Sequence, residues 1–203
     1  MMGVLHIDRK RFLIMGGVGY AALIALLAAL FFTGTVFAAF PLAGIGGFVV
    51  AADEIIGNGF ELSPAIGETS EKSLWPQAGV ELDSVTIKGM NLSKELDVSD
   101  SLGNYGIHKV LVEIIATQDV EGEGVNMRIS GMVADRAEFS SMEVNENYSD
   151  NPLLKLGLSA DTMELTNPEL NAHALSTQSI TIPGMKLKIK AYDANDNLIG
   201  GDF

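Results

Sequence analysis

Cysteine is absent from this chain of 203 residues, and histidine and tryptophan are scarce, with three and one respectively. The absence of cysteine excludes disulfide bonds, a lipidated cysteine anchor, thiolate metal ligands and a cysteine nucleophile. Charge is also missing from one long stretch, because no charged side chain occurs between Phe12 and Ala52. The chain therefore divides into an uncharged amino-terminal stretch and a charged remainder.

Basic residues are few in the charged remainder. After residue 40 there are 25 acidic and 10 basic side chains, which gives a net charge of −15. A domain with this charge repels phosphate backbones, so nucleic acids are not expected as partners. Cations, neutral sugars, apolar ligands and other proteins remain as partners, and the acidic excess also serves solubility.

The uncharged stretch predicts a transmembrane helix over residues 12–40. A helix of these 29 residues is about 43 Å long, which exceeds the hydrocarbon core of about 30 Å. The basic segment 1–11 ends in Arg9, Lys10 and Arg11, which places the amino terminus in the cytoplasm by the positive-inside rule. We therefore expect a single-pass protein of the cell membrane with its carboxy-terminal domain outside the cytoplasm.

A cleaved signal peptide is the alternative interpretation of the same segment. Val36, Phe37 and Ala38 have the small-residue spacing that signal peptidase prefers, with cleavage before Ala39. The apolar stretch is longer than the usual signal-peptide core of about 7–15 residues, which favours a retained anchor. A protein cleaved there is secreted, so both interpretations export the domain.

Small residues recur at every fourth position of the predicted helix, at Gly17, Ala21, Ala25 and Ala29. Such a stripe lets a second helix approach closely in lipid. It predicts a homo-oligomer or a membrane-protein partner, although alanine is also common in membrane-spanning segments.

Beyond a glycine-rich hinge over residues 41–50, the pattern predicts a mostly β domain over 51–203. Apolar and polar residues alternate in several short runs, which is typical of strands with one buried face. The clearest runs are 110–115, 125–129, 154–158 and 185–191. We expect roughly eight to ten strands in an antiparallel β-sandwich or an elongated, groove-like β-sheet.

Turn-forming residues separate these runs. They occur at Gly57-Asn58-Gly59, Gly122-Glu123-Gly124, Asn151-Pro152, Asn167-Pro168 and Pro183-Gly184. An Ala-Asp pair also recurs, at Ala52-Asp53, Ala134-Asp135 and Ala160-Asp161, with unequal spacing. The unequal spacing does not support a strict solenoid.

The segment from Ala38 to Leu62, AAFPLAGIGGFVVAADEIIGNGFEL, and the segment ITIPGMKLKI from Ile180 to Ile189 resemble a known family. It is the domain of unknown function 6230, a family of exported proteins best known from actinomycetes. The resemblance covers nearly the whole chain, but its motifs are structural in type. Some members of this family are labelled cholesterol esterase, so the resemblance implies that activity. It also implies a multi-pass membrane protein as a partner.

An esterase-type site has weak support in the residues. The nearest approach to a nucleophile elbow is Gly157-Leu158-Ser159-Ala160-Asp161, which lacks the second glycine and lies in a strand pattern. A triad of Ser159, Asp161 and His173 is therefore the only catalytic candidate, and ordinary strand and surface roles explain the same residues.

Metal binding has one candidate segment. Asp193, Asn195 and Asn197 offer oxygen ligands in the style of a calcium loop, but the glycine and the distant glutamate of an EF-hand are missing. A tight hairpin turn explains the same residues. No cofactor is expected.

These observations predict a membrane-anchored, surface-displayed and non-enzymatic module that binds an apolar or lipid ligand together with a membrane partner. One alternative is a structural subunit of a surface fibre or layer, built by exchange of the strand-like segment 39–50 between neighbours. The second alternative is an esterase-type hydrolase.

Overall fold

The computed structural model describes residues 45–201 of the chain. These residues belong to the second of two compact units, Phe40–Phe203. The predicted helix over 12–40, its small-residue stripe at Gly17, Ala21, Ala25 and Ala29, and the basic segment 1–11 lie outside the described residues. Between residues 45 and 201 no helix is both long and apolar enough to cross a bilayer.

The described residues are mostly strand, with a single four-residue α-helix. The strands in chain order are Phe48–Ala51 (β1), Glu54–Gly67 (β2), Trp75–Lys88 (β3), Asn91–Asp97 (β4), Lys109–Ile115 (β5), Val120–Val133 (β6), Arg136–Ser140 (β7), Glu143–Glu146 (β8), Leu156–Thr166 (β9), Glu169–Ser176 (β10), Ser179–Thr181 (β11), Lys186–Tyr192 (β12) and Leu198–Gly200 (β13). The helix is Ser99–Leu102 (α2), and short 3-10 turns lie at Gly103–Tyr105 and Pro152–Leu154.

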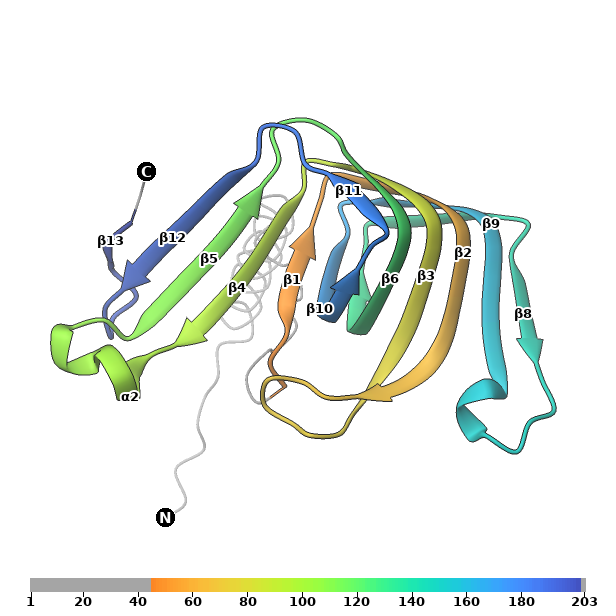
Figure 1. Ribbon diagram of the computed structural model, residues 1–203, viewed down its shortest axis with the longest axis horizontal. Coiled ribbons are helices and arrows are strands. Elements are labelled where there is room, and N and C mark those ends of the chain that lie inside the picture. The colour runs from red at the N-terminus through yellow and green to blue at the C-terminus, as the bar shows by residue number, and fades with distance from the viewer. Residues whose placement is uncertain (1–44, 202–203) are drawn as a thin grey trace, which may run out of the picture. The chain divides into compact units, whose positions relative to one another are not determined.

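All thirteen strands join in one hydrogen-bonded sheet (Figure 1). Its order is β13-β12-β5-β4-β1-β10-β6-β3-β2-β9-β7, with β11 added to β6 and β8 added to β9. Every strand pairing in this part of the chain is antiparallel. The predicted mostly β, antiparallel fold is therefore confirmed. The strand count exceeds the prediction because β1, β8, β11 and β13 are too short to produce a visible alternation.

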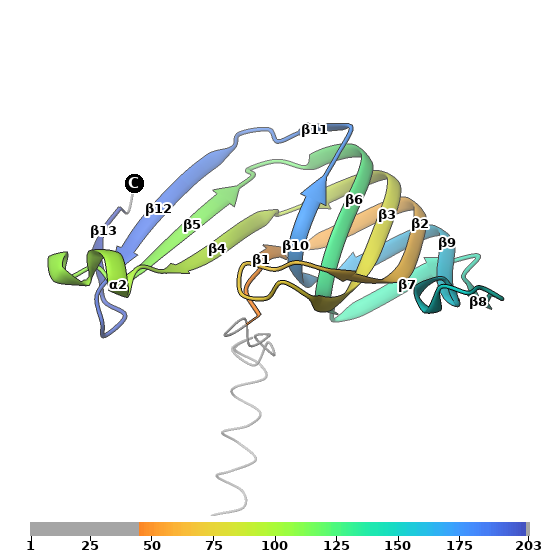
Figure 2. The same ribbon diagram turned by 60° about the horizontal axis from the view of Figure 1, so that its bottom comes forward.

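The sheet has two regions, which Figures 1 and 2 both separate clearly. The body contains β1, β10, β6, β3, β2, β9 and β7 with the additions β8 and β11, and it is strongly curved. The wing contains β4, β5, β12 and β13 and extends away from the body beyond β1. Because β4 pairs with β1, the wing continues the same sheet rather than forming a second one.

A crease crosses four adjacent strands of the body. Along a regular strand, inward-facing residues are two positions apart. Here the buried residues are three apart, from Gly57 to Phe60 on β2, and likewise on its neighbours. The corresponding pairs are Leu82 and Val85 on β3, Gly122 and Val125 on β6, and Ala160 and Met163 on β9. The register is preserved across the crease, so four strands change phase together.

The crease corrects two turn predictions. Gly57-Asn58-Gly59 and Gly122-Glu123-Gly124 lie inside the fourteen-residue strands β2 and β6 and not between strands. Gly59 has φ of +65° and Gly124 has φ of +57°, a backbone conformation that glycine adopts at little steric cost. The glycines therefore bend the strands instead of ending them. The three proline-containing turns do separate elements as predicted.

The body is closed at one end by short connections. Only Asn167 and Pro168 join β9 to β10, although β6, β3 and β2 lie between these two strands in the sheet. Backbone hydrogen bonds tie the connections to each other, from Ala52 to Pro168 (3.1 Å), from Asn167 to Asp53 (2.8 Å) and from Asp135 to Thr166 (3.0 Å). Two of the repeated Ala-Asp pairs, at 52–53 and 134–135, form these connections, whereas the third lies in the crease.

The hydrophobic core fills the inside of the creased body. Its largest cluster includes Phe60, Leu82, Val125 and Leu165, and Leu165 has no exposed surface. The rings of Phe60 on β2 and Phe139 on β7 approach to 5.4 Å between centroids. A smaller cluster of Met90, Ala116 and Val120 lies among the residues that flank β4, β5 and β6.

The outward face of the wing is polar and carries ion pairs. Lys190 Nζ lies 2.7 Å from Glu113 Oε2, and the Glu113 side chain is only 12% exposed. Lys109 contacts Glu95 at 3.5 Å and Asp196 at 2.5 Å. The hydrogen bond from Lys190 is the largest cause that holds the pKa of Glu113 below its usual range, against the opposing effect of burial.

Replacing a crease glycine tests the role of this bend. We expect Gly59→Ala to lower the free energy of unfolding by about 2–3 kcal/mol, because the new Cβ meets the Asp83 carboxylate in a backbone conformation that already disfavours alanine. The matched control is Gly106→Ala, which has φ of +77° but no neighbouring atom within 4 Å, and which should cost about 1 kcal/mol. Urea unfolding followed by fluorescence of Trp75 measures both. Equal losses in the two variants would contradict the close packing at the crease.

Removing the charge of Glu113 gives a pH-dependent effect. Because the folded-state pKa of Glu113 is lowered, its contribution to stability is present above the unfolded pKa of about 4.3 and is lost as the pH falls through the lower folded value. We expect Glu113→Gln to destabilise the protein by about 1–2 kcal/mol at pH 7 and by much less at pH 3. The control is Glu146→Gln, on the exposed strand β8, which should change little at either pH. A loss of stability for Glu113→Gln that is the same at both pH values would show that the ion pair is not its source.

Candidate functional site

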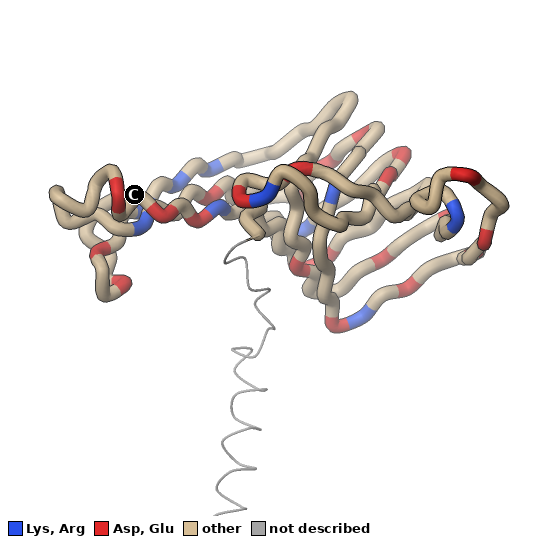
Figure 3. The backbone as a smooth tube through the Cα atoms, turned by 90° about the horizontal axis from the view of Figure 1, so that it is seen from below, with Lys and Arg blue, Asp and Glu red and all other residues tan. Residues whose placement is uncertain are grey.

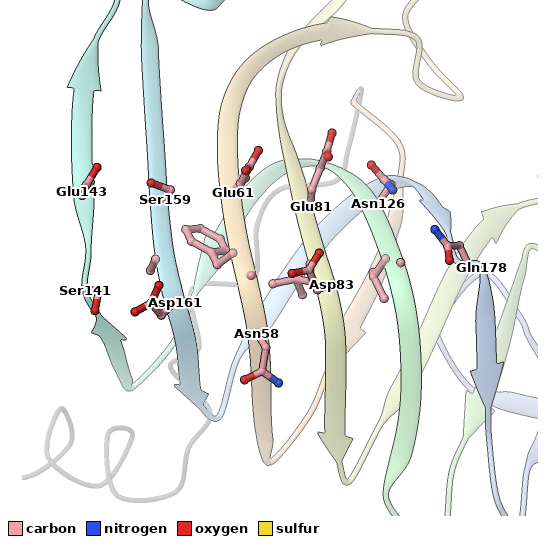
Figure 4. A pocket seen from close by; sticks show the side chains of 16 residues that line it. Asn58, Glu61, Glu81, Asp83, Asn126, Ser141, Glu143, Ser159, Asp161 and Gln178 are labelled. Atoms are coloured by element: carbon pink, nitrogen blue, oxygen red, sulfur yellow. The ribbon is translucent and has the colours of Figure 1, made fainter.

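A hollow with a volume of about 810 Å³ lies over the crease (Figure 4). Carboxylates dominate its lining, with Glu61, Glu81, Asp83, Glu143 and Asp161, and no lysine, arginine or histidine contributes to it. Across residues 45–201 no group of three histidine or acidic side chains is arranged to hold a metal ion. The charged side chains of this hollow are therefore all acidic.

The structure separates the predicted catalytic residues. Ser159 and Asp161 lie on β9 and line the acidic hollow, whereas His173 lies on β10 and lines a different hollow. Ser159 is in the middle of a strand, where it pairs with Glu61 on one side and Glu143 on the other. Two carboxylates beside a serine oppose the negative charge that develops in ester hydrolysis. This arrangement does not assemble a triad.

Asp193, Asn195 and Asn197 form the turn between β12 and β13. Asp193 Oδ1 accepts hydrogen bonds from the backbone nitrogens of Asn195 (2.8 Å) and Asn197 (2.9 Å), and the Asn197 amide donates to Oδ2 (2.9 Å). The hydrogen bond from the Asn197 side chain is the largest cause that lowers the pKa of Asp193. The oxygens of Asp193 thus stabilise the hairpin, as the turn interpretation expects.

The inward face of the wing is apolar and continues the face that forms the core. This face consists of nine residues, which lie in three cross-strand rows over β4, β5 and β12. Eight of the nine are apolar. The rows are Leu92-Ile114-Leu187, Lys94-Val112-Ile189 and Leu96-Val110-Ala191. Leu92 of β4 pairs with Val50 of β1, which is a core residue. The core surface therefore passes without a break onto the wing.

This wing face is not covered within the part of the chain that the structure describes. Leu187 is 57% exposed and Ile189 is 52% exposed. The elements in extensive contact with β4, β5 and β12 are only their neighbours in the sheet. A contiguous exposed apolar patch on a domain this polar is typical of a binding surface. Figure 3 shows how strongly acidic positions outnumber basic ones along the backbone.

A second hollow, of about 540 Å³, lies where the wing meets the body. Its lining brings together Lys94 from β4, Arg128 from β6 and His173 from β10, beside the apolar Phe48 and Leu92. Lys94 Nζ donates to the backbone oxygen of Gly47 at 2.5 Å and to Ser70 Oγ at 3.3 Å. The charged side chains of this hollow, which we call the basic hollow, are mainly basic. Those of the hollow over the crease are all acidic.

His173 is half-buried in the basic hollow, and neither of its ring nitrogens has a hydrogen-bond partner. Burial is the main cause that lowers the pKa of His173, with the charges of Lys94 and Arg128 adding to the effect. The imidazole is therefore neutral at pH 7, and both of its ring nitrogens are buried without a hydrogen-bond partner among the described residues.

Sequence reasoning missed both the wing face and the basic hollow. The alternation at 110–115 and 185–191 was a visible signal that each strand has an apolar face. It did not show that these two strands are neighbours, or that their apolar faces lie uncovered. The basic hollow draws on residues 94, 128 and 173, which no local motif connects.

The comparisons with known proteins give one positive finding. No curated protein and no solved structure matches this chain. The model of a family of unknown function, DUF6230, matches residues 46–195, which covers most of the chain and all but the last of the described strands. The resemblance seen in the sequence is thereby confirmed, and the chain belongs to the DUF6230 family.

Proposed function

We propose that this protein is a non-enzymatic lipid-binding module, held at the outer face of the cell membrane by the apolar segment 12–40. The lipid chain lies along the inward face of the wing. The observation that carries the proposal is the apolar face of one continuous sheet, on which the exposed Leu187 and Ile189 continue the half-buried Leu92, Val112 and Ile114.

The dimensions of the wing suit an extended acyl chain. The seven residues of β5 span about 23 Å, which is long enough for the chain of a long-chain fatty acid. Each methylene group that leaves water on this face contributes about 0.8 kcal/mol.

The membrane anchor and the uncovered face support each other. A domain anchored close to a bilayer meets lipid at high local concentration. In the sequence the segment 12–40 comes shortly before β1, and β1 pairs with β4, the first strand of the wing. A membrane partner that delivers or receives the lipid fits the same arrangement.

The two alternatives have less support. In a fibre built by strand exchange, residues 39–50 are donated to a neighbour, but Phe48–Val50 pair within the same chain, between β4 and β10. Ester hydrolysis needs a base near Ser159, and His173 lines a different hollow.

Substitutions on the wing test the proposal. We expect Leu187→Ser with Ile189→Ser to lower lipid affinity by at least about tenfold, because both side chains lose their apolar contact with the ligand. Stability should change little, since both side chains are more than half exposed. The measurement is native mass spectrometry of the full chain, purified gently from its own membranes, with the lipid-sized adduct as the readout.

The matched control is Lys186→Ser, on the opposite face of the same strand, which should keep the adduct. Adducts that persist unchanged in the Leu187 and Ile189 variant would rule out the wing as the binding surface. A bare protein in a ladder of oligomers would favour the fibre instead.

A further inference from the structure

The basic hollow lies at one end of the apolar wing face and shares residues with it. Leu92 and Lys94 belong to two of the three cross-strand rows, and both line the hollow. Lys94 is the one charged side chain among the nine residues of these rows. A ligand that extends along the wing therefore reaches the hollow without leaving the surface.

The charge of the hollow is unusual for this domain. Only 10 of its 35 charged side chains after residue 40 are basic. Two of these, Lys94 and Arg128, meet in the hollow from strands that are far apart in the sequence, and a single acidic residue, the exposed Glu68, lines it with them. Local charge of this sign attracts an anion despite the negative charge of the whole domain.

Donors in the hollow are available for a ligand. Arg128 is exposed, and it forms no hydrogen bond or ion pair with any other described residue. Lys94 lines the same hollow and adds an ammonium group. A guanidinium and an ammonium together match the oxygens of a carboxylate or a phosphate.

We propose that the ligand of this module is an anionic amphiphile, whose carboxylate or phosphate head binds Lys94 and Arg128 while its single chain lies along the wing. The inference rests on the proposed function and makes it more specific. It excludes neutral lipids as the preferred ligand and places the head at the edge of the wing face where β4 meets β1.

Three ligands with the same chain and different heads test this inference. They are hexadecanoate, hexadecyl phosphate and hexadecanol, added below their aggregation concentrations to the full chain, and inorganic phosphate serves as a head without a chain. Native mass spectrometry from nonionic detergent gives the bound fraction of each. We expect both anionic ligands to bind at least about tenfold more tightly than hexadecanol, since charge-assisted hydrogen bonds are made only by the anions.

Charge substitutions locate the head. The double variant Lys94→Gln with Arg128→Gln should bind all three chain-bearing ligands with the weaker affinity of hexadecanol. The control double variant, Arg136→Gln with Lys155→Gln, makes the same change in net charge at exposed positions outside the hollow and should keep the preference. Arg128→Gln alone guards against misfolding, because Arg128 forms no hydrogen bond with another described residue, and this variant should lose most of the preference.

Each result has a distinct meaning. Equal binding of hexadecanol and hexadecanoate to the natural chain would overturn the anionic head while leaving lipid binding intact. An equal loss of preference in both double variants would overturn the assignment of the head to this hollow. Inorganic phosphate that binds as tightly as hexadecyl phosphate would overturn the contact between the chain and the wing. Failure of all three chain-bearing ligands to bind would overturn the proposed function itself.

Discussion

The crease across β9, β2, β3 and β6 is the constraint on which the rest of this fold depends. At one line of the sheet four neighbouring strands place two successive residues outward, and the inward residues on both sides of the line then face each other across the core. One sheet thereby produces a core that two separate sheets would otherwise have to build. Glycines at positive φ on β2 and β6 make this bend possible without strain.

The crease also explains why the wing is left uncovered. Because the body is curved, it buries its own apolar face. The short connections at 52–53, 134–135 and 167–168 hold its end closed. β4, β5 and β12 lie beyond this curvature, yet they carry the same apolar face that β1 contributes to the core. Among the described residues no protein layer covers this apolar face, and a lipid chain is the occupant that the proposed location supplies.

The sequence predicted features that depend on residues close together in the chain. It did not predict features that depend on how the strands pair. Alternation identified β5, β6 and β12, and proline marked three true turns. The glycine pairs around Asn58 and Glu123 were interpreted as turns, because a coordinated change of phase looks the same as a strand end in any single strand. The basic hollow depends on the pairing order of the sheet, which brings residues from β4, β6 and β10 together and which no pattern within one strand determines.

The central claim is that an acyl chain contacts the inward face of the wing, and the lack of cysteine in this chain allows a direct measurement. A single cysteine placed at Leu187, and separately at Lys186 on the opposite face of β12, can carry a bimane fluorophore in the otherwise unchanged protein. Fatty acid brominated along its chain should quench the fluorophore at position 187 strongly and that at position 186 weakly. Equal quenching at the two positions would contradict the account, because the lipid would then not distinguish the apolar face of the wing from the polar one.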